Sequence, residues 1–108
     1  MSESRPARET EPVIDDVAGH RFVIHEGSAD AELVYRARPG RLILVHTEVP
    51  QELGGRGLGT RLVLAALERA RRTGETVVPW CPFARKWITE HPAAVSGLSI
   101  DWSEPPPH

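Results

Sequence analysis

A cluster of glycines is the part of this 108-residue sequence that most directly indicates chemistry. Residues 54–59 read Gly-Gly-Arg-Gly-Leu-Gly, so that four of six positions are glycine. Such a run costs more backbone entropy than a short connection requires, but it lets the backbone approach a ligand closely. An amphipathic segment follows at once, and the free N–H groups of a helix N-terminus attract anions. The pattern predicts a phosphate or pyrophosphate site; the alternative is a flexible turn before a helix.

Two well-known phosphate-binding patterns do not fit this cluster. A P-loop requires Lys and then Ser or Thr after its last glycine, whereas Thr60 and Arg61 follow Gly59. A dinucleotide-binding loop requires a third glycine three residues after the second. That position is Leu62 or Thr60, depending on which glycines are counted. The preceding segments also predict a β-meander instead of a βαβ unit.

Three polar side chains near the cluster have the chemistry of catalytic groups. Cys81 precedes Pro82, a residue favoured in the first turn of a helix, and the positive end of a helix favours a thiolate. A lone cysteine is also often a buried structural residue. His46 can accept a proton near neutral pH, or serve only as a hydrogen-bonded residue at a strand end. Glu48 is expected on the same strand face as His46, as a reserve base or a solvated charge.

Hydrophobic periodicity predicts the elements that must position these residues. Alternating or β-branched segments predict four strands, over residues 20–26, 32–38, 41–49 and 76–80. The third of these is apolar on both faces, which is typical of a central strand. Helical spacing of apolar residues predicts two helices, over residues 58–72 and 82–91. Residues 98–102 form a last short strand or a packed segment. The expected order is β-β-β-α-β-α in an α+β fold.

Composition restricts the class of protein. The 13 basic and 15 acidic residues give a net charge of -2, which argues against a generic nucleic-acid binder. The apolar runs are too short for a membrane helix, and residues 1–12 lack the apolar core of a secretory signal. One cysteine excludes an intramolecular disulfide, and the histidines have no metal-ligand spacing, so no metal is expected.

These features predict one domain over residues 13–102. A flexible tail is expected over residues 1–12 and a Pro-rich tail over residues 103–108. We expect a cytoplasmic protein that is a monomer or a weak homodimer.

The glycine cluster resembles the coenzyme-A pyrophosphate loop of the GNAT acetyltransferase superfamily, whose pattern is Arg/Gln-x-x-Gly-x-Gly/Ala. Gly57 and Gly59 match this pattern, while Gly54 stands where the pattern has Arg or Gln. A side-chain contact is lost there, but a backbone cradle is kept. Residues 46–50, 78–83 and 90–92 resemble the minimal stand-alone subclass of that superfamily. The resemblance covers roughly residues 20–93.

This resemblance implies a GNAT-like α/β sandwich with a mostly antiparallel sheet, and an acetyl-CoA-dependent N-acetyltransferase acting on a small-molecule or peptide amine. The strand before the loop would splay from its neighbour and pair with the pantetheine arm. The residues expected to contact coenzyme A are Thr47, Glu48, Val49, Gly54, Gly55, Arg56, Gly57, Leu58, Gly59, Thr60, Phe83, Lys86 and Trp87. Trp87 is equally compatible with a place in the core.

In the minimal subclass, the residues that match Cys81 and His46 are proposed catalytic groups, with the histidine as the base. Two alternatives remain open. One is a non-catalytic coenzyme-A-binding or protein-interaction module of the same fold. The other is a structural domain that binds no cofactor.

Overall fold

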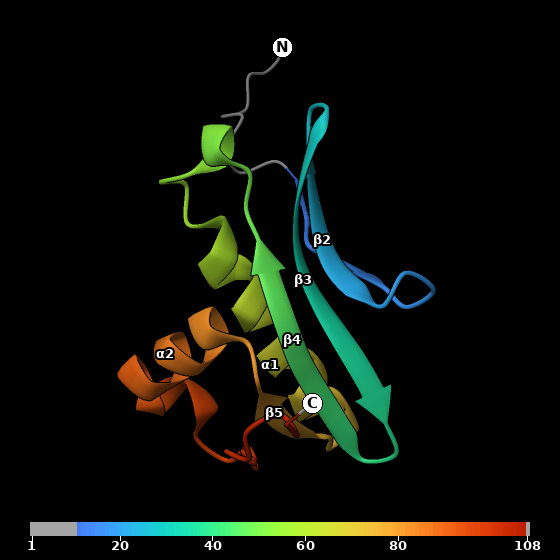
Figure 1. Ribbon diagram of the computed structural model, residues 1–108, viewed down its shortest axis with the longest axis vertical. Helices are drawn as coiled ribbons and strands as arrows, with labels where there is room; N and C mark the ends of the chain where they lie inside the picture. Colours follow the sequence, from blue (N-terminus) through green and yellow to red (C-terminus); the bar gives the residue numbers. More distant parts are fainter. Residues whose placement is uncertain (1–10, 108) are drawn as a thin grey trace.

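Five strands form one sheet whose order in space follows the order in the chain. The computed structural model describes residues 11–107 (Figure 1). The strands are β1 (Ile14–Asp16), β2 (Arg21–Glu26), β3 (Ala29–Arg38), β4 (Arg41–Glu48) and β5 (Thr76–Pro79). The helices are α1 (Leu58–Thr73) and α2 (Pro82–Glu90), with short 3-10 segments at Gln51–Leu53 and Pro92–Val95.

Neighbouring strands are antiparallel from β1 to β4, and β5 pairs with β4 in parallel. The predicted α+β class and the mostly antiparallel sheet are therefore confirmed. The strand β1 was not predicted, so the described order has four strands before α1 instead of three. This strand has only three residues, two of them aspartates, which gives no alternating pattern to detect.

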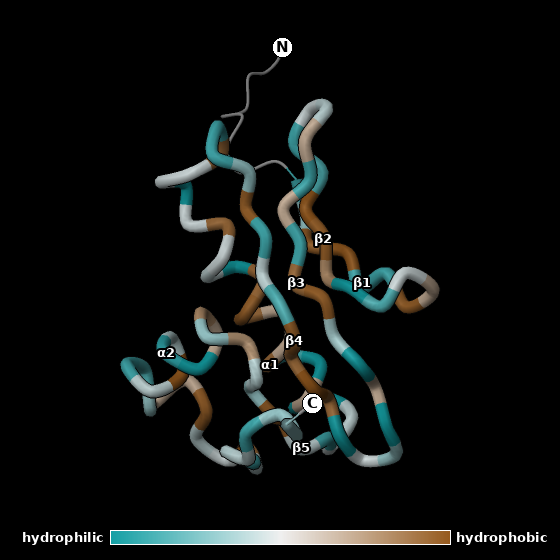
Figure 2. The backbone as a smooth tube through the Cα atoms, viewed as in Figure 1, coloured by the Kyte–Doolittle hydropathy of each residue, from teal (hydrophilic) through white to brown (hydrophobic). Residues whose placement is uncertain are grey.

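The core lies between the sheet and the helices. In Figure 1, α1 runs behind the sheet and α2 lies beside its β4–β5 side, and Figure 2 shows the hydrophobic segments in the strands that face them. α1 buries one stripe, made of Leu58, Leu62, Val63, Ala66, Leu67 and Ala70. These positions recur at the spacing of one helical face, as the sequence predicts. No helix of residues 11–107 has the length and hydrophobicity of a membrane span.

The predicted N-terminal tail lies mostly outside the described residues, which begin at Glu11. Val13 packs against the core, and the Glu11 carbonyl accepts a hydrogen bond from Arg61, so residues 11–13 are held to the domain. In the predicted C-terminal tail, residues 103–107 have no regular structure and are exposed.

The segment before that tail runs along β5. The N–H of Val77 donates to the Ser99 carbonyl at 3.0 Å, and the N–H of Asp101 donates to the Val77 carbonyl at 2.8 Å. The Asp101 carboxylate also pairs with Arg41 at 2.8 Å. Hydrogen bonds from Ser103, with that of Arg41, lower the pKa of Asp101 to about 2. Residues 98–102, expected to form either a last short strand or a packed segment, are a packed segment with a single bridge to the sheet.

A polar network joins β1 and β3 of the sheet to α1. The Tyr35 hydroxyl donates to Asp15, and Arg69 donates to both the Tyr35 hydroxyl and Asp15. Two further hydrogen bonds join the Arg69 guanidinium to the Glu75 carboxylate. Burial, with the hydrogen bond to Asp15, raises the pKa of Tyr35 to about 12.

The raised pKa of Tyr35 predicts that the folded protein loses stability at alkaline pH. The pKa of Tyr35 is higher in the folded protein than its ordinary value of 10.0, so its contribution is complete below pH 10 and is lost as the pH rises through 12. Two pKa units correspond to at most about 3 kcal/mol. Urea denaturation between pH 8 and pH 12 should show this decline, and Tyr35→Phe should flatten it. An equally steep decline in the variant would assign the effect to other groups.

Candidate functional site

A hollow of about 440 Å³ lies at the N-terminus of α1. It is lined by Thr47, Val49, Leu53, Gly54, Gly55, Gly57, Leu58, Gly59, Thr60 and Phe83. Nine of these ten residues are among those predicted to contact a cofactor. Leu53 was missed, although its place beside the glycines and its apolar side chain are the signal that would have found it. The hollow brings together the end of β4, the glycine loop and the start of α2.

The N-terminus of α1 has the features of an anion site. Its N-cap is Gly57, with φ 73° and ψ 19°, and no side chain caps the helix. The first turn also contains no acidic residue that would repel an anion. Gly55 has φ 81°. These left-handed conformations explain why glycine is needed at both positions, and the uncapped N–H groups are available to a ligand.

At Gly59 the space for a side chain is limited by Phe83. A Cβ built on Gly59 would lie 2.8 Å from Cζ of the Phe83 ring, closer than real Cβ contacts. The ring itself is 42% exposed and forms a wall of the hollow. The contact therefore joins the start of α1 to α2 at the hollow.

Gly59→Ala is expected to destabilise the protein by about 1–2 kcal/mol through this overlap. Alanine in a helix otherwise stabilises by about 1 kcal/mol relative to glycine, so the sign of the effect is diagnostic. Urea denaturation measures it. Phe83→Leu, which removes the obstructing ring atoms, should restore stability in the double variant. A more stable Gly59→Ala protein would show that the ring moves away freely.

The strands β4 and β5 separate beside the hollow. Their pairing ends at Leu44 and Pro79, and the N–H of Cys81 then donates to the Leu44 carbonyl at 2.8 Å. Residues 45–48 continue along β3 only, so within the described chain this stretch of β4 has no strand on its other side. Its outward backbone groups are free to pair with an extended ligand, as the resemblance implied.

Cys81 lies where the strands separate. It is the N-cap residue of α2 and is 2% exposed. Its Sγ lies 3.1 Å from the hydroxyl oxygen of Thr47, which itself lines the hollow. The thiol is therefore one hydrogen bond away from the predicted cofactor site.

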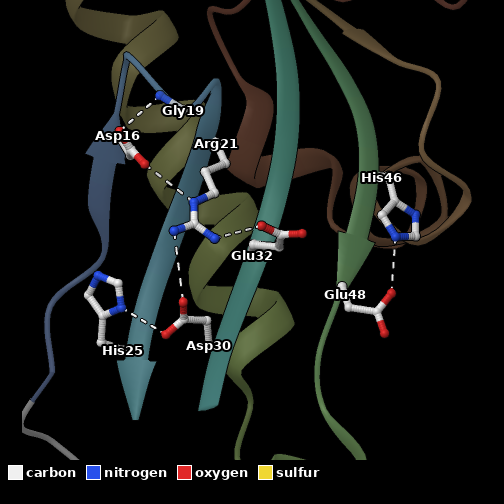
Figure 3. A network of polar contacts seen from close by, with 8 residues as sticks. All are labelled: Asp16, Gly19, Arg21, His25, Asp30, Glu32, His46 and Glu48. Carbon is white, nitrogen blue, oxygen red and sulfur yellow. Dashed lines mark hydrogen bonds and ion pairs between the residues drawn. The ribbon is translucent and has the colours of Figure 1, made fainter. Parts of the chain in front are cut away.

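His46 and Cys81 are not in contact. The imidazole Nε2 of His46 lies 3.1 Å from a carboxylate oxygen of Glu48, and both side chains are more than half exposed. Figure 3 shows the pair projecting from β4 on the face of the sheet away from α1. Cys81, by contrast, belongs to the core on the helical side.

A β-bulge explains the separation. Leu44 pairs with Tyr35 but His46 pairs with Val34, so β4 has one extra residue at this point. Thr47, opposite the buried Leu33, is thereby turned toward the core, and His46 toward the outer face. Strict alternation would have placed His46 on the same face as Leu44.

The other predicted contacts lie outside the lining of the hollow. Glu48 is engaged with His46, as described. Arg56 is half exposed and lies 3.7 Å from Glu26. Lys86 forms an ion pair with Glu90 on the surface of α2, and the Trp87 ring stacks on His91 with centroids 4.0 Å apart. Among residues 11–107, no three His, Cys, Asp or Glu side chains gather as metal ligands.

The fold and the site define a class of protein: an α+β domain with a separated strand pair and an uncapped helix start at a hollow. A family model for GCN5-related N-acetyltransferases matches residues 21–97, which cover the sheet from β2 onward, the loop and both helices. The chain belongs to this GCN5-related N-acetyltransferase family. The predicted resemblance is thus confirmed. No curated protein matches the chain.

Proposed function

We propose that this protein is an acetyl-CoA-dependent N-acetyltransferase. The observation that carries the proposal is the uncapped N-terminus of α1, which opens on the hollow and has no acidic residue in its first turn. A pyrophosphate fits this environment because it supplies the negative charge and the hydrogen-bond acceptors that the helix end lacks. Acetyl-CoA would supply the activated acetyl group, as a thioester.

The residues around the hollow support distinct binding roles. The backbone N–H groups of residues 57–60 would hold the pyrophosphate. The free edge of residues 45–48 would pair with the amide groups of the pantetheine arm. Phe83 and Val49 would pack against its apolar parts. Gly54 contributes backbone only, so the backbone supplies the phosphate contacts that an Arg or Gln would share in related loops.

The acceptor amine would form a bond to the acetyl carbon while the carbon–sulfur bond breaks and the coenzyme-A thiol leaves. The proton of the attacking amine must go to a base, and His46 is the candidate on the outer face. With its Nε2–H donated to Glu48, the imidazole keeps Nδ1 free to accept that proton. Cys81 lies on the helical side of the sheet, near Thr47, so any part that it takes in the reaction would be independent of His46.

A non-catalytic coenzyme-A-binding module is the second candidate. The burial of Cys81 and the exposure of the His46–Glu48 pair favour it, because neither group is held against an obvious acceptor site. The two candidates differ in turnover. An acetyltransferase must release coenzyme A in the presence of a suitable amine, whereas a binding module holds acetyl-CoA without consuming it.

Calorimetric titration with acetyl-CoA tests the binding step on which both candidates depend. We expect one site with a dissociation constant between about 1 µM and 1 mM, the range of enzyme Michaelis constants. Arg72→Gln should bind as the wild type does, since Arg72 is exposed on α1 and lies 4.0 Å from Glu68, outside the lining of the hollow. Absence of heat at about 1 mM acetyl-CoA would overturn the proposal. Release of free thiol with a panel of amines then distinguishes the enzyme from the binding module.

A further inference from the structure

The strand β3 has a free edge at the end of the sheet opposite to the hollow. Its pairing with β2 ends at Val34 and Arg21, and a single further hydrogen bond joins the Tyr35 N–H to the His20 carbonyl. From Arg36 to Arg38, β3 pairs with β4 only. Figure 1 shows this stretch extending beyond the end of β2 toward the hairpin with β4.

At Ala37, the backbone N–H of this edge is directed away from β4. Arg38 pairs with Arg41 across a two-residue turn, so these residues form a hydrogen-bonded pair, and Ala37 forms the non-hydrogen-bonded pair with Leu42. The N–H of Ala37 is therefore directed away from β4, where the described chain provides no strand to receive it. An added strand would accept this donor.

Two arginines without a carboxylate partner flank the free edge. The guanidinium of Arg36 lies 5.9 Å from the centroid of the Trp80 ring, and that of Arg38 donates to the neighbouring Ala37 carbonyl at 3.1 Å. Arg36 and Arg38 are both exposed, and no carboxylate of residues 11–107 lies within 4.0 Å of either guanidinium. The nearby carboxylates are already engaged, since Asp15 pairs with Arg69 and Asp16 with Arg21. Arg36 and Arg38 are two residues apart in one strand, so they project from the same face of the sheet.

A second hollow of about 440 Å³ lies against this edge. Its lining combines Arg36 and Arg38 with Arg69, Tyr35 and the apolar Val17, Val34 and Ala37. Val17 is 65% exposed, although it is a large apolar residue at the tip of the β1–β2 hairpin. His20, also in the lining, has φ 58°, a left-handed conformation directly before β2 begins at Arg21, and the pairing of β2 with β3 therefore does not extend past Val34.

We propose that the β3 edge at residues 36–38 binds an extended acidic segment of a partner protein. The segment adds as a strand beside β3 and accepts the Ala37 N–H. Its acidic side chains, on one face of the added strand, pair with Arg36 and Arg38, and its apolar side chains, on the other face, lie beside Ala37. The charge of the two guanidinium groups and the free donor select this occupant over an apolar or basic one. The site lies at the opposite end of β4 from the cofactor hollow and does not depend on acetyl transfer.

Fluorescence anisotropy with a labelled octapeptide of alternating Glu and Val tests this proposal. We expect saturable binding that weakens with salt, and no binding of the same peptide with Gln in place of Glu. Arg36→Gln combined with Arg38→Gln should weaken binding at least about tenfold, because both charge-assisted contacts are lost. Arg72→Gln, an exposed arginine on α1, is the matched control and should bind normally.

Ala37→Pro tests the strand edge independently of charge. Proline removes the outward N–H and is tolerated on edge strands, so the variant should fold and lose binding. Circular dichroism verifies the fold of each variant. Equal binding by the double arginine variant, or by the Gln peptide, would overturn the proposal. Displacement of the peptide by excess coenzyme A would also overturn it, because the anion would then be at α1.

Discussion

Gly57→Glu is expected to weaken acetyl-CoA binding by about 100-fold or more. Gly57 has φ 73°, so any side chain with a Cβ is strained there by about 1–2 kcal/mol. The added carboxylate would also stand at the helix N-terminus, where it would cap the free N–H groups and repel the pyrophosphate. Calorimetric titration measures the loss directly.

Gly57→Asn separates strain from charge in this experiment. Asparagine adopts the left-handed conformation more readily than other residues and has no charge, so it should lose less affinity than glutamate, while its amide oxygen can still cap the helix N–H groups. Similar affinities for the Glu variant and the wild type would place the pyrophosphate elsewhere. An equally large loss in the Asn variant would indicate that side-chain capping or backbone conformation, and not charge, controls the site.

Cys81→Ala is expected to lower kcat by about 100-fold with little change in KM, if the thiol takes part in transfer. The residue is buried at the point where β4 and β5 separate, and Thr47 contacts its sulfur at 3.1 Å. Steady-state release of coenzyme A measures the effect, and thermal unfolding serves as the control. Full turnover by a Cys81→Ala variant with a lower melting temperature would show that Cys81 has a structural role and no catalytic one.

The double variant with His46→Ala tests whether the two residues act together. Residues that act as one unit give a double variant no worse than the single ones. Cys81 contacts Thr47 and His46 contacts Glu48, on opposite faces of the sheet. We therefore expect their separate losses in kcat to multiply. A non-additive result would require a rearrangement that brings the two side chains together.

The fold could be predicted largely because its elements have strong local signals. The apolar stripe of α1 and the left-handed C-cap Gly74, with φ 81°, determine where that helix lies and ends. The apolar segment of β4 marks a central strand, and Leu42 and Leu44 are indeed fully buried. The strand β1 has no such signal, because three residues are too few to show a period and its partner β2 supplies the pairing.

The part of the candidate site that is formed by the backbone could be predicted from the sequence. The orientations of its side chains could be predicted less well. The glycines report on backbone conformation and close approach, so the sequence predicted nearly all of the lining of the hollow. The faces of His46 and Thr47 depend on the bulge opposite Val34 and Tyr35, which leaves no mark in the alternation of β4. Contacts of Lys86 and Trp87 depend on helix rotation and on local partners, Glu90 and His91.

The segment that runs along β5 covers the outer edge of the sheet. β5 would otherwise end the sheet with an open edge next to Val77 and Val78, both fully buried. Such edges template the addition of strands from other molecules, and β-branched segments are prone to this. Ser99 and Asp101 occupy the Val77 backbone groups, and Arg41 holds Asp101 by an ion pair. A chain shortened before Ser99 is therefore expected to expose this edge of the sheet and to aggregate more readily than the full chain.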